Sequence, residues 1–138
     1  MNIPSEIIDD ALGSLVVVEE TAYYSEIPWS RNIEIGIFIH VTPENYESRI
    51  QNAKRMLPIL QNFEQTLLDT GINHLLNSKV IDDSFDWNEM FLHNSSETSI
   101  EFNKDGSGQF VYLVMIAGSM IIKFDKDGNF KDVQAMNG

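Results

Sequence analysis

The sequence contains no cysteine and few basic residues. Of its 138 residues, 9 are Lys or Arg and 21 are Asp or Glu, which gives a formal net charge of −12. The absence of cysteine excludes disulfides, thiol nucleophiles, zinc–thiolate sites and iron–sulfur clusters, and it favours a cytoplasmic protein. The shortage of basic residues argues against direct binding to nucleic acid or to an anionic membrane, because both partners require a positively charged surface.

Long apolar runs are also missing. No run approaches the ~18 residues of a membrane span, and the first residues, MNIPSEIIDDAL, lack the basic residues and apolar core of a signal peptide. We therefore expect a cytoplasmic protein with no membrane partner. The length fits a single α+β domain over residues 1–138.

Catalytic and metal-binding motifs are absent as well. The sequence has no Gly-x-Ser-x-Gly elbow, phosphate-binding Gly-rich loop or His-Glu-x-x-His. Glu89 and His93 have the spacing of a metal pair on one helix face, but no third ligand follows at a known spacing. The acids near Asp82 could perform acid–base chemistry, although clustered loop carboxylates are usually solvated. We predict a non-enzymatic protein without cofactor or metal.

Apolar spacing predicts strands and a short helix in the first third of the chain. In IEIGIFIHV, residues 33–41, every second residue is apolar, so one strand face belongs to the core and the other is half exposed. A second strand is predicted from residue 14. The aromatic stretch between these strands is predicted to be a structured loop with its turn at Pro28 and Trp29. Residues 3–13 have the capping and composition of a short helix.

The middle of the chain predicts helices. Thr42 can cap a helix in which Pro43 takes the first position, and apolar residues recur at helical spacing up to residue 76. Pro58 has no backbone N–H and is predicted to break or kink this helix near Met56. Residues 82–93 predict one more short helix.

The last third predicts a four-stranded antiparallel meander over residues 98–136. The segments IEFNKDGSGQF and IKFDKDGNF each place Asp-Gly between alternating apolar runs, which is a strong hairpin signal. The two segments do not match an EF-hand calcium loop, because its twelfth position requires a bidentate Glu and is occupied here by Tyr112 and Gln134. The strand FVYLVMIAG is apolar on both faces, which indicates a centrally covered strand or an outer face occupied by a partner.

These elements predict an α+β fold. We expect an antiparallel sheet of about six strands, two from residues 14–41 and four from residues 98–136, with two to three helices packed on one face.

The negative charge is unevenly distributed. Residues 1–48 hold nine acids and one base, residues 82–101 hold six acids and no base, and residues 49–81 hold two acids and four bases. The acidic segments are either a solvated surface or a docking face for a basic protein. The docking hypothesis selects Asp82, Asp83, Asp86 and Glu89, with Trp87 as an aromatic anchor and Glu19 and Glu20 as neighbours.

The C-terminal half also supports a resemblance. It resembles uncharacterised bacterial domain-of-unknown-function families in the order of its features. These are Ser99-Ile100, an Asp-Gly hairpin, an aromatic strand, a glycine, an aliphatic strand and a final glycine. Such families often have Gly-His before the aliphatic strand, where this chain has Gly118-Ser119. Small acidic α+β proteins of this type are similar to immunity proteins that neutralise toxins encoded beside them. The resemblance carries over no binding residue.

Two functions therefore remain in view. The first is a non-catalytic, immunity-type inhibitor that docks an acidic face on a basic partner such as a toxin. The alternative is a small-ligand-binding or metabolic accessory domain with a pocket between helices and sheet. The sequence leaves the oligomeric state open, a homodimer included.

Overall fold

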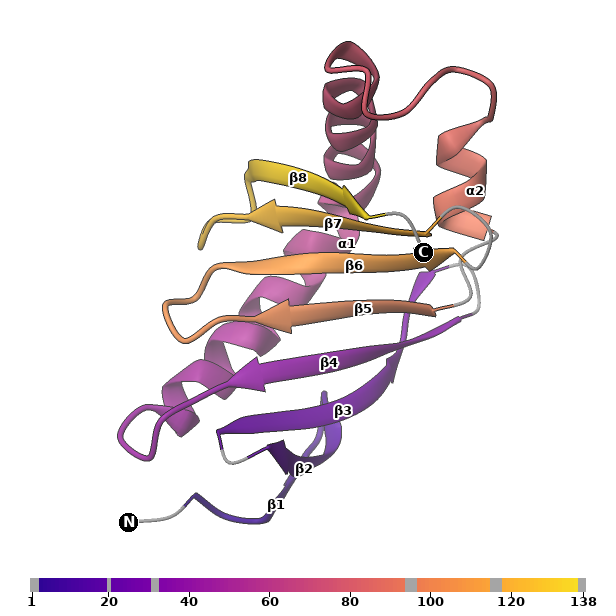
Figure 1. Cartoon of the computed structure of the whole chain (residues 1–138). Helices are drawn as coiled ribbons and strands as arrows, with labels where there is room; N and C mark the ends of the chain where they lie inside the picture. Colours follow the sequence, from indigo (N-terminus) through magenta and orange to yellow (C-terminus); the bar gives the residue numbers. More distant parts are fainter. Residues whose placement is uncertain (1–2, 20, 31–32, 94–96, 115–117, 137–138) are drawn as a thin grey trace.

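Two groups of four strands, separated by two helices, make up the fold (Figure 1). The structure is a computed structural model that describes residues 3–19, 21–30, 33–93, 97–114 and 118–136. The strands are β1 (Glu6–Asp9), β2 (Gly13–Glu19), β3 (Ala22–Pro28), β4 (Glu34–His40), β5 (Glu97–Phe102), β6 (Gly108–Val114), β7 (Gly118–Phe124) and β8 (Phe130–Met136). The helices are α1 (Tyr46–Asn77) and α2 (Trp87–His93). In the described part of the chain, no helix has the length and apolar character needed to cross a membrane.

All the strands belong to one mixed sheet. Its 8 strands lie in sequence order, and neighbours are antiparallel except β4 and β5, which are parallel. Parallel neighbours require a crossover connection, which α1 and α2 supply. The prediction of about six antiparallel strands with two to three helices was therefore wrong, because the chain folds into eight strands with one long and one short helix. The C-terminal meander within that prediction is confirmed.

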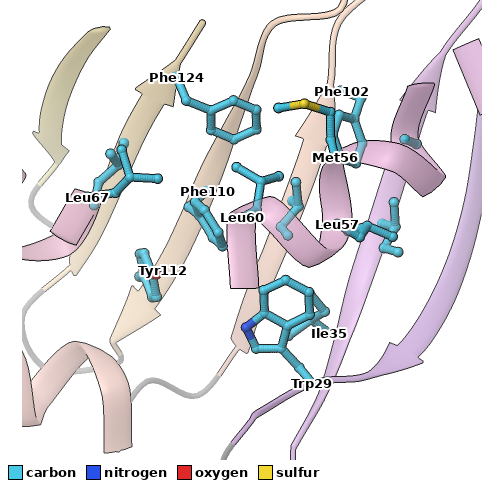
Figure 2. Close-up of a cluster of buried hydrophobic side chains, with 14 of the residues drawn as sticks. Trp29, Ile35, Met56, Leu57, Leu60, Leu67, Phe102, Phe110, Tyr112 and Phe124 are labelled. Atoms are coloured by element: carbon cyan, nitrogen blue, oxygen red, sulfur yellow. The ribbon is translucent and has the colours of Figure 1, made fainter. Parts of the chain in front are cut away.

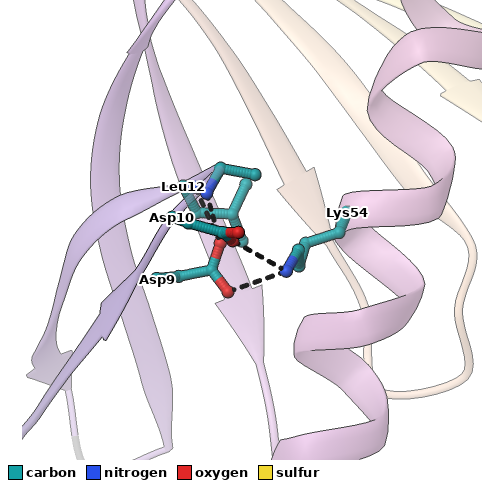
Figure 3. A network of polar contacts seen from close by, with 5 residues as sticks. Asp9, Asp10, Leu12 and Lys54 are labelled. Carbon is teal, nitrogen blue, oxygen red and sulfur yellow. Dashed lines mark hydrogen bonds and ion pairs between the residues drawn. The ribbon is translucent and has the colours of Figure 1, made fainter.

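The predicted N-terminal helix is a hairpin instead. The Asp9 carboxylate accepts hydrogen bonds from two backbone N–H groups of the following turn, at 2.8 and 2.9 Å. Gly13 then takes a φ of 75°, which lets the chain return as β2. Lys54 of α1 forms ion pairs with Asp9 at 3.0 Å and Asp10 at 3.3 Å (Figure 3). The turn thus has its own side-chain bonding, which stabilises it against the helix that its sequence also allows.

The predicted aromatic loop is largely strand β3. Its pairing with β4 runs from Ala22 opposite His40 to Pro28 opposite Glu34. Ser25 occupies a buried position in β3 and donates a hydrogen bond to the Leu12 carbonyl at 2.5 Å. Because this inward position is polar, the alternation of the strand is hidden in the sequence. Of the two residues predicted at the turn, Pro28 is the last residue of β3, and Trp29 follows it and donates a backbone hydrogen bond to the Ile33 carbonyl at 2.8 Å. Residues 31–32 of this connection lie outside the described ranges.

Helix α1 is continuous for 32 residues. At about 1.5 Å per residue it is roughly 48 Å long, which exceeds the roughly 38 Å width of eight strands. It crosses the sheet obliquely and extends past β8 (Figure 1). The helix begins at Tyr46 and not near Pro43, because the Asn45 side chain accepts a hydrogen bond from the Thr42 backbone at 2.7 Å in a preceding turn.

Of the predicted break or kink near Met56, the break does not occur, because α1 runs through Pro58 as a single helix. Pro58 lies on the exposed side of α1, whereas Leu57 and Leu60 beside it are buried against the sheet. The carbonyl that lacks a partner because of the proline can therefore be hydrated. Packing on both sides of Pro58 maintains the helix.

Replacing Pro58 with alanine is expected to raise the free energy of unfolding by about 1–3 kcal/mol. The new N–H can donate to the Lys54 carbonyl, and alanine removes the steric clash of the proline ring in a helix interior. Urea denaturation measures the effect. Pro43→Ala, which lies in the turn before α1, is the control and should change stability by less than about 0.5 kcal/mol. A loss of stability in Pro58→Ala would mean that the proline geometry is needed for docking of α1.

The core lies between α1 and one face of the sheet. Aliphatic side chains of α1 pack on aromatic side chains of β5, β6 and β7, with Trp29 at one margin (Figure 2). Glu64 is also buried here, with 3% of its surface exposed. Its carboxylate accepts hydrogen bonds from the Trp29 indole at 3.1 Å and from the Tyr112 hydroxyl at 2.7 Å. The Glu64 carboxylate therefore joins α1 to β6 through Tyr112 and to the end of β3 through Trp29.

The two Asp-Gly segments form turns of the same construction, as predicted. In each, the glycine has a positive φ, 93° at Gly106 and 87° at Gly128. Its N–H donates to the carbonyl of Asn103 at 3.1 Å in the first turn and of Asp125 at 3.0 Å in the second. Across the described ranges, no group of three or more His, Cys, Asp or Glu side chains could hold a metal ion.

Candidate docking surface

The sheet has one face that no described element covers. Both helices pack on the other face, where Ile35, Ile37 and Ile39 of β4 are buried. The alternate residues Phe38 and His40 point away from the helices and are half-buried, which confirms the prediction for this strand. We call the side formed by these alternate residues of β1 to β8 the uncovered face.

Acidic side chains predominate on the uncovered face. The strand registers assign to it Glu6, Glu19, Glu26, Glu34, Glu97, Glu101 and Asp132. The basic side chains on it include Lys123, which is in register with Asp132, and His40. This face concentrates negative charge from strands that are far apart in the sequence.

Aromatic and aliphatic residues lie among these acids. The rings of Tyr24 and Phe38 are in contact, with centroids 4.8 Å apart. The Tyr24 ring lies over Gly36, where an added Cβ would be 3.0 Å from Tyr24 Cε1. Val111 and Ile121 form a second, aliphatic pair in neighbouring strands. The uncovered face therefore combines apolar contact area with acidic groups.

Glu101 lies near the middle of this face. It is in register with Phe38 on one side and with Gln109 on the other. Its Oε1 accepts a hydrogen bond from Gln109 Nε2 at 2.7 Å, and its Oε2 lies 2.9 Å from His40 Nε2. Two neighbours thus fix the carboxylate, while 32% of the side chain stays exposed.

The pKa of the Tyr24 hydroxyl is raised by the acids of this face. Its hydrogen bond to Glu26 Oε1, at 2.8 Å, is the main cause that raises the pKa of Tyr24 to about 12, followed by burial and by the charges of Glu26 and Glu97. The two carboxylates favour the protonated hydroxyl because a phenolate would add a third negative charge.

The acidic segment selected from the sequence lies elsewhere, in the connection between α1 and α2 and in the first turn of α2. Two of its acids have local structural contacts: Asp82 accepts a hydrogen bond from the Ser84 backbone at 2.9 Å, and Asp86 accepts one from the Glu89 backbone at 3.2 Å at the start of α2. Asp83 and Glu89 are exposed. The hydrogen bonds to Ser84 also lower the pKa of Asp82. This segment therefore brings Asp82, Asp83, Asp86 and Glu89 together, apart from the uncovered face.

Trp87 is half-buried in this segment. Its ring stacks on the buried Phe91 at 5.9 Å, and its indole N–H donates to the Asp82 carbonyl at 2.5 Å. Phe85, which is 55% exposed, is the aromatic side chain presented to solvent there. Trp87 thus links the segment to the core through Phe91, which contacts Tyr112.

Glu19 and Glu20 were predicted to neighbour this segment. Glu19 is exposed at the end of β2, and its register with Ala22 puts it in the same cross-strand row as His40. This row lies at the end of the sheet where β4 ends, whereas α2 packs near Tyr112, beside the start of β5 (Figure 1). Glu19 therefore belongs to the uncovered face. Glu20 and the side chain of His93 lie outside the described set.

Sequence reasoning missed most of the uncovered face, although one signal pointed to it. The strand that is apolar on both faces indicated either a centrally covered strand or an outer face occupied by a partner, and Leu113 of that strand is 41% exposed. Residues 115–117 of the same stretch lie outside the described ranges. The strand register that brings together acids from six of the eight strands has no signal in a single sequence.

Several hollows lined by described residues lie at the surface. One is lined by the end of α1 and the following turn, from Leu76 to Asp83. Between α1 and the sheet, buried hydrophobic side chains form one packed cluster (Figure 2). The alternative function, a pocket between helices and sheet, stays a prediction. Comparisons with protein families, with curated protein sequences and with solved structures found no match.

Proposed function

We propose that this protein is a non-catalytic binding protein that docks a basic protein on the uncovered face. It would act as an immunity-type inhibitor does, by covering the positively charged active site of a partner such as a toxin. The observation that carries the proposal is an uncovered sheet face on which acids surround Tyr24 and Phe38. We place this function in the cytoplasm because the chain has no cysteine.

The size of the uncovered face fits a protein partner. Eight strands about 4.8 Å apart, with about seven residues each at about 3.3 Å per residue, cover roughly 850 Å². A stable protein–protein interface buries about 800 Å² on each partner. Acids around apolar residues are also the arrangement in which charge increases the association rate and apolar groups supply much of the affinity.

Charge decides which protein fits. A second copy of this chain would place acidic residues opposite acidic residues, and like charges at an interface cost several kcal/mol. Nucleic acid would meet the same repulsion from its phosphates. A protein with a basic surface is the occupant that this face complements.

The test uses three charge variants as baits in a pull-down from the native host. The face variant is Glu26→Gln, Glu97→Gln and Asp132→Asn. The segment variant is Asp83→Asn with Glu89→Gln, and the control is Glu44→Gln with Asp69→Asn on exposed acids near and on α1. Captured proteins are identified, purified and measured for association and dissociation rates at several salt concentrations.

We expect a basic partner that the wild-type and control baits retain and that the face variant loses. Its association rate should fall about tenfold or more in the face variant and decrease as salt rises. If only the segment variant loses the partner, the docking site is in residues 82–89 and not on the uncovered face. Equal capture by all baits, or an acidic partner, would contradict the proposal.

A further inference from the structure

We infer that the middle of the uncovered face binds an arginine side chain of the partner, with Glu101 as the carboxylate and the Tyr24–Phe38 pair as the aromatic surface. This inference rests on the proposed function and specifies the chemistry of its contact. It is carried by the fixed carboxylate, the adjoining ring and the absence of a neighbouring strand or helix above them among the described residues.

The Glu101 carboxylate is held in place while it keeps acceptor capacity. Gln109 Nε2 lies 2.7 Å from Oε1, and His40 Nε2 lies 2.9 Å from Oε2. Each carboxylate oxygen can accept two hydrogen bonds, so both oxygens have a second acceptor site. A guanidinium group can bond to both with two parallel N–H donors.

The aromatic pair lies directly beside this carboxylate. Phe38 is in register with Glu101 on the adjacent strand, and the Tyr24 ring contacts Phe38 at 4.8 Å. Gly36 has no side chain, so the Tyr24 ring can lie over the backbone of β4. Glu26 holds the Tyr24 hydroxyl at 2.8 Å. A planar cation can therefore stack on a fixed ring while it bonds to a fixed carboxylate.

This geometry favours arginine over lysine. The guanidinium is planar, presents paired donors and loses less hydration when it stacks on a ring, whereas an ammonium group is a compact, strongly hydrated charge. General electrostatic attraction to an acidic face does not distinguish the two. A preference between peptides of equal charge therefore isolates the Glu101–Phe38 contact.

The experiment titrates the full chain with acetylated, amidated hexa-arginine and hexa-lysine peptides at low salt, by calorimetry and by NMR. The variants are Glu101→Gln and Phe38→Leu, which alter the site, and Asp132→Asn, which removes one charge from the same face. We expect wild type to bind hexa-arginine about threefold to tenfold more tightly than hexa-lysine. Glu101→Gln and Phe38→Leu should reduce this ratio to below about twofold, whereas Asp132→Asn should weaken both peptides and keep the ratio.

The outcomes separate this inference from the proposed function. Equal affinity of wild type for both peptides, or an unchanged ratio in Glu101→Gln, would overturn the arginine site and leave salt-dependent docking intact. No binding of either peptide, or NMR shifts confined to residues 79–90, would overturn both. Because Phe38 is half-buried, melting temperatures are recorded for each variant, and Glu101→Gln alone decides the result if Phe38→Leu is unfolded.

Discussion

Replacement of Gly108 with alanine is expected to lower the free energy of unfolding by on the order of 3 kcal/mol. Gly108 begins β6, opposite Phe102 of β5. A Cβ atom at this position would lie 2.4 Å from the backbone carbonyl oxygen of Glu101 and 2.7 Å from Cζ of Phe124. Because the nearest atom is backbone, a strand must move, and pairing of β5 with β6 is weakened where it joins the hairpin turn.

Gly36→Ala is the matched control for this prediction. Its Cβ would meet the Tyr24 ring at 3.0 Å, so the ring needs to shift by only a few tenths of an ångström, and no backbone atom is among the close contacts. We expect a loss of less than about 1 kcal/mol. Urea denaturation of both variants decides the comparison. Equal losses for Gly108→Ala and Gly36→Ala would show that backbone contact does not determine the cost.

Much of the C-terminal half could be predicted from the sequence because its signals are local. Asp-Gly between alternating apolar runs specifies a hairpin within about ten residues, and both turns have glycine at a positive φ. Each strand then pairs with the next one along the chain. Local turn chemistry was sufficient to specify this meander.

The N-terminal half was harder because competing signals have similar strength. Residues 6–9 can form a helix or a strand, and the strand forms because it pairs with β2 and because Lys54 holds the turn from a distance of more than forty residues. The effect of Pro58 on the continuity of α1 was overestimated, because packing of the helix against the sheet outweighs the local cost of a proline. Both errors come from tertiary contacts that a local pattern does not contain.

For the proposed docking surface, the sequence predicted only the acidic character and not the position. Composition allowed either a solvated acidic surface or a docking face for a basic partner, but the position of the acids depends on register, and the parallel pairing of β4 with β5 places Glu101 beside Phe38. The segment that looked most acidic in the sequence uses two of its aspartates for local hydrogen bonds. The acids of residues 82–89 were chosen because they are close together in the sequence, whereas a sheet face gathers acids from many strands.

Glu64 shows a signal that was present and overlooked. It lies four residues after Leu60 and three before Leu67, on the apolar stripe of α1. A charged residue on such a stripe must find hydrogen-bond donors in the core, because burial of an ion without them is costly. Tyr112 and Trp29 provide those donors.

Glu64→Ala is expected to lower the free energy of unfolding by about 3–5 kcal/mol. The change removes the acceptor of two buried donors, the Trp29 indole N–H and the Tyr112 hydroxyl, and leaves a cavity beneath α1. Glu64→Gln should cost only about 1–2 kcal/mol. The amide oxygen can accept from Trp29, which only donates, and the amide N–H can donate to the Tyr112 oxygen, which can also accept. Urea denaturation followed by tryptophan fluorescence measures both.

A double-mutant cycle assigns this loss to the hydrogen bond. When Glu64 is alanine, the Tyr112 hydroxyl has lost the acceptor at 2.7 Å, so removing it with Tyr112→Phe should cost about 1–2 kcal/mol less than it does in the wild type. Tyr24→Phe is the control, because its hydroxyl bonds to Glu26 on the uncovered face, and it should be additive with Glu64→Ala within about 0.5 kcal/mol. A coupling near zero for Tyr112, or similar losses for alanine and glutamine at position 64, would mean that lost packing accounts for the effect and that the carboxylate does not hold α1 to the sheet.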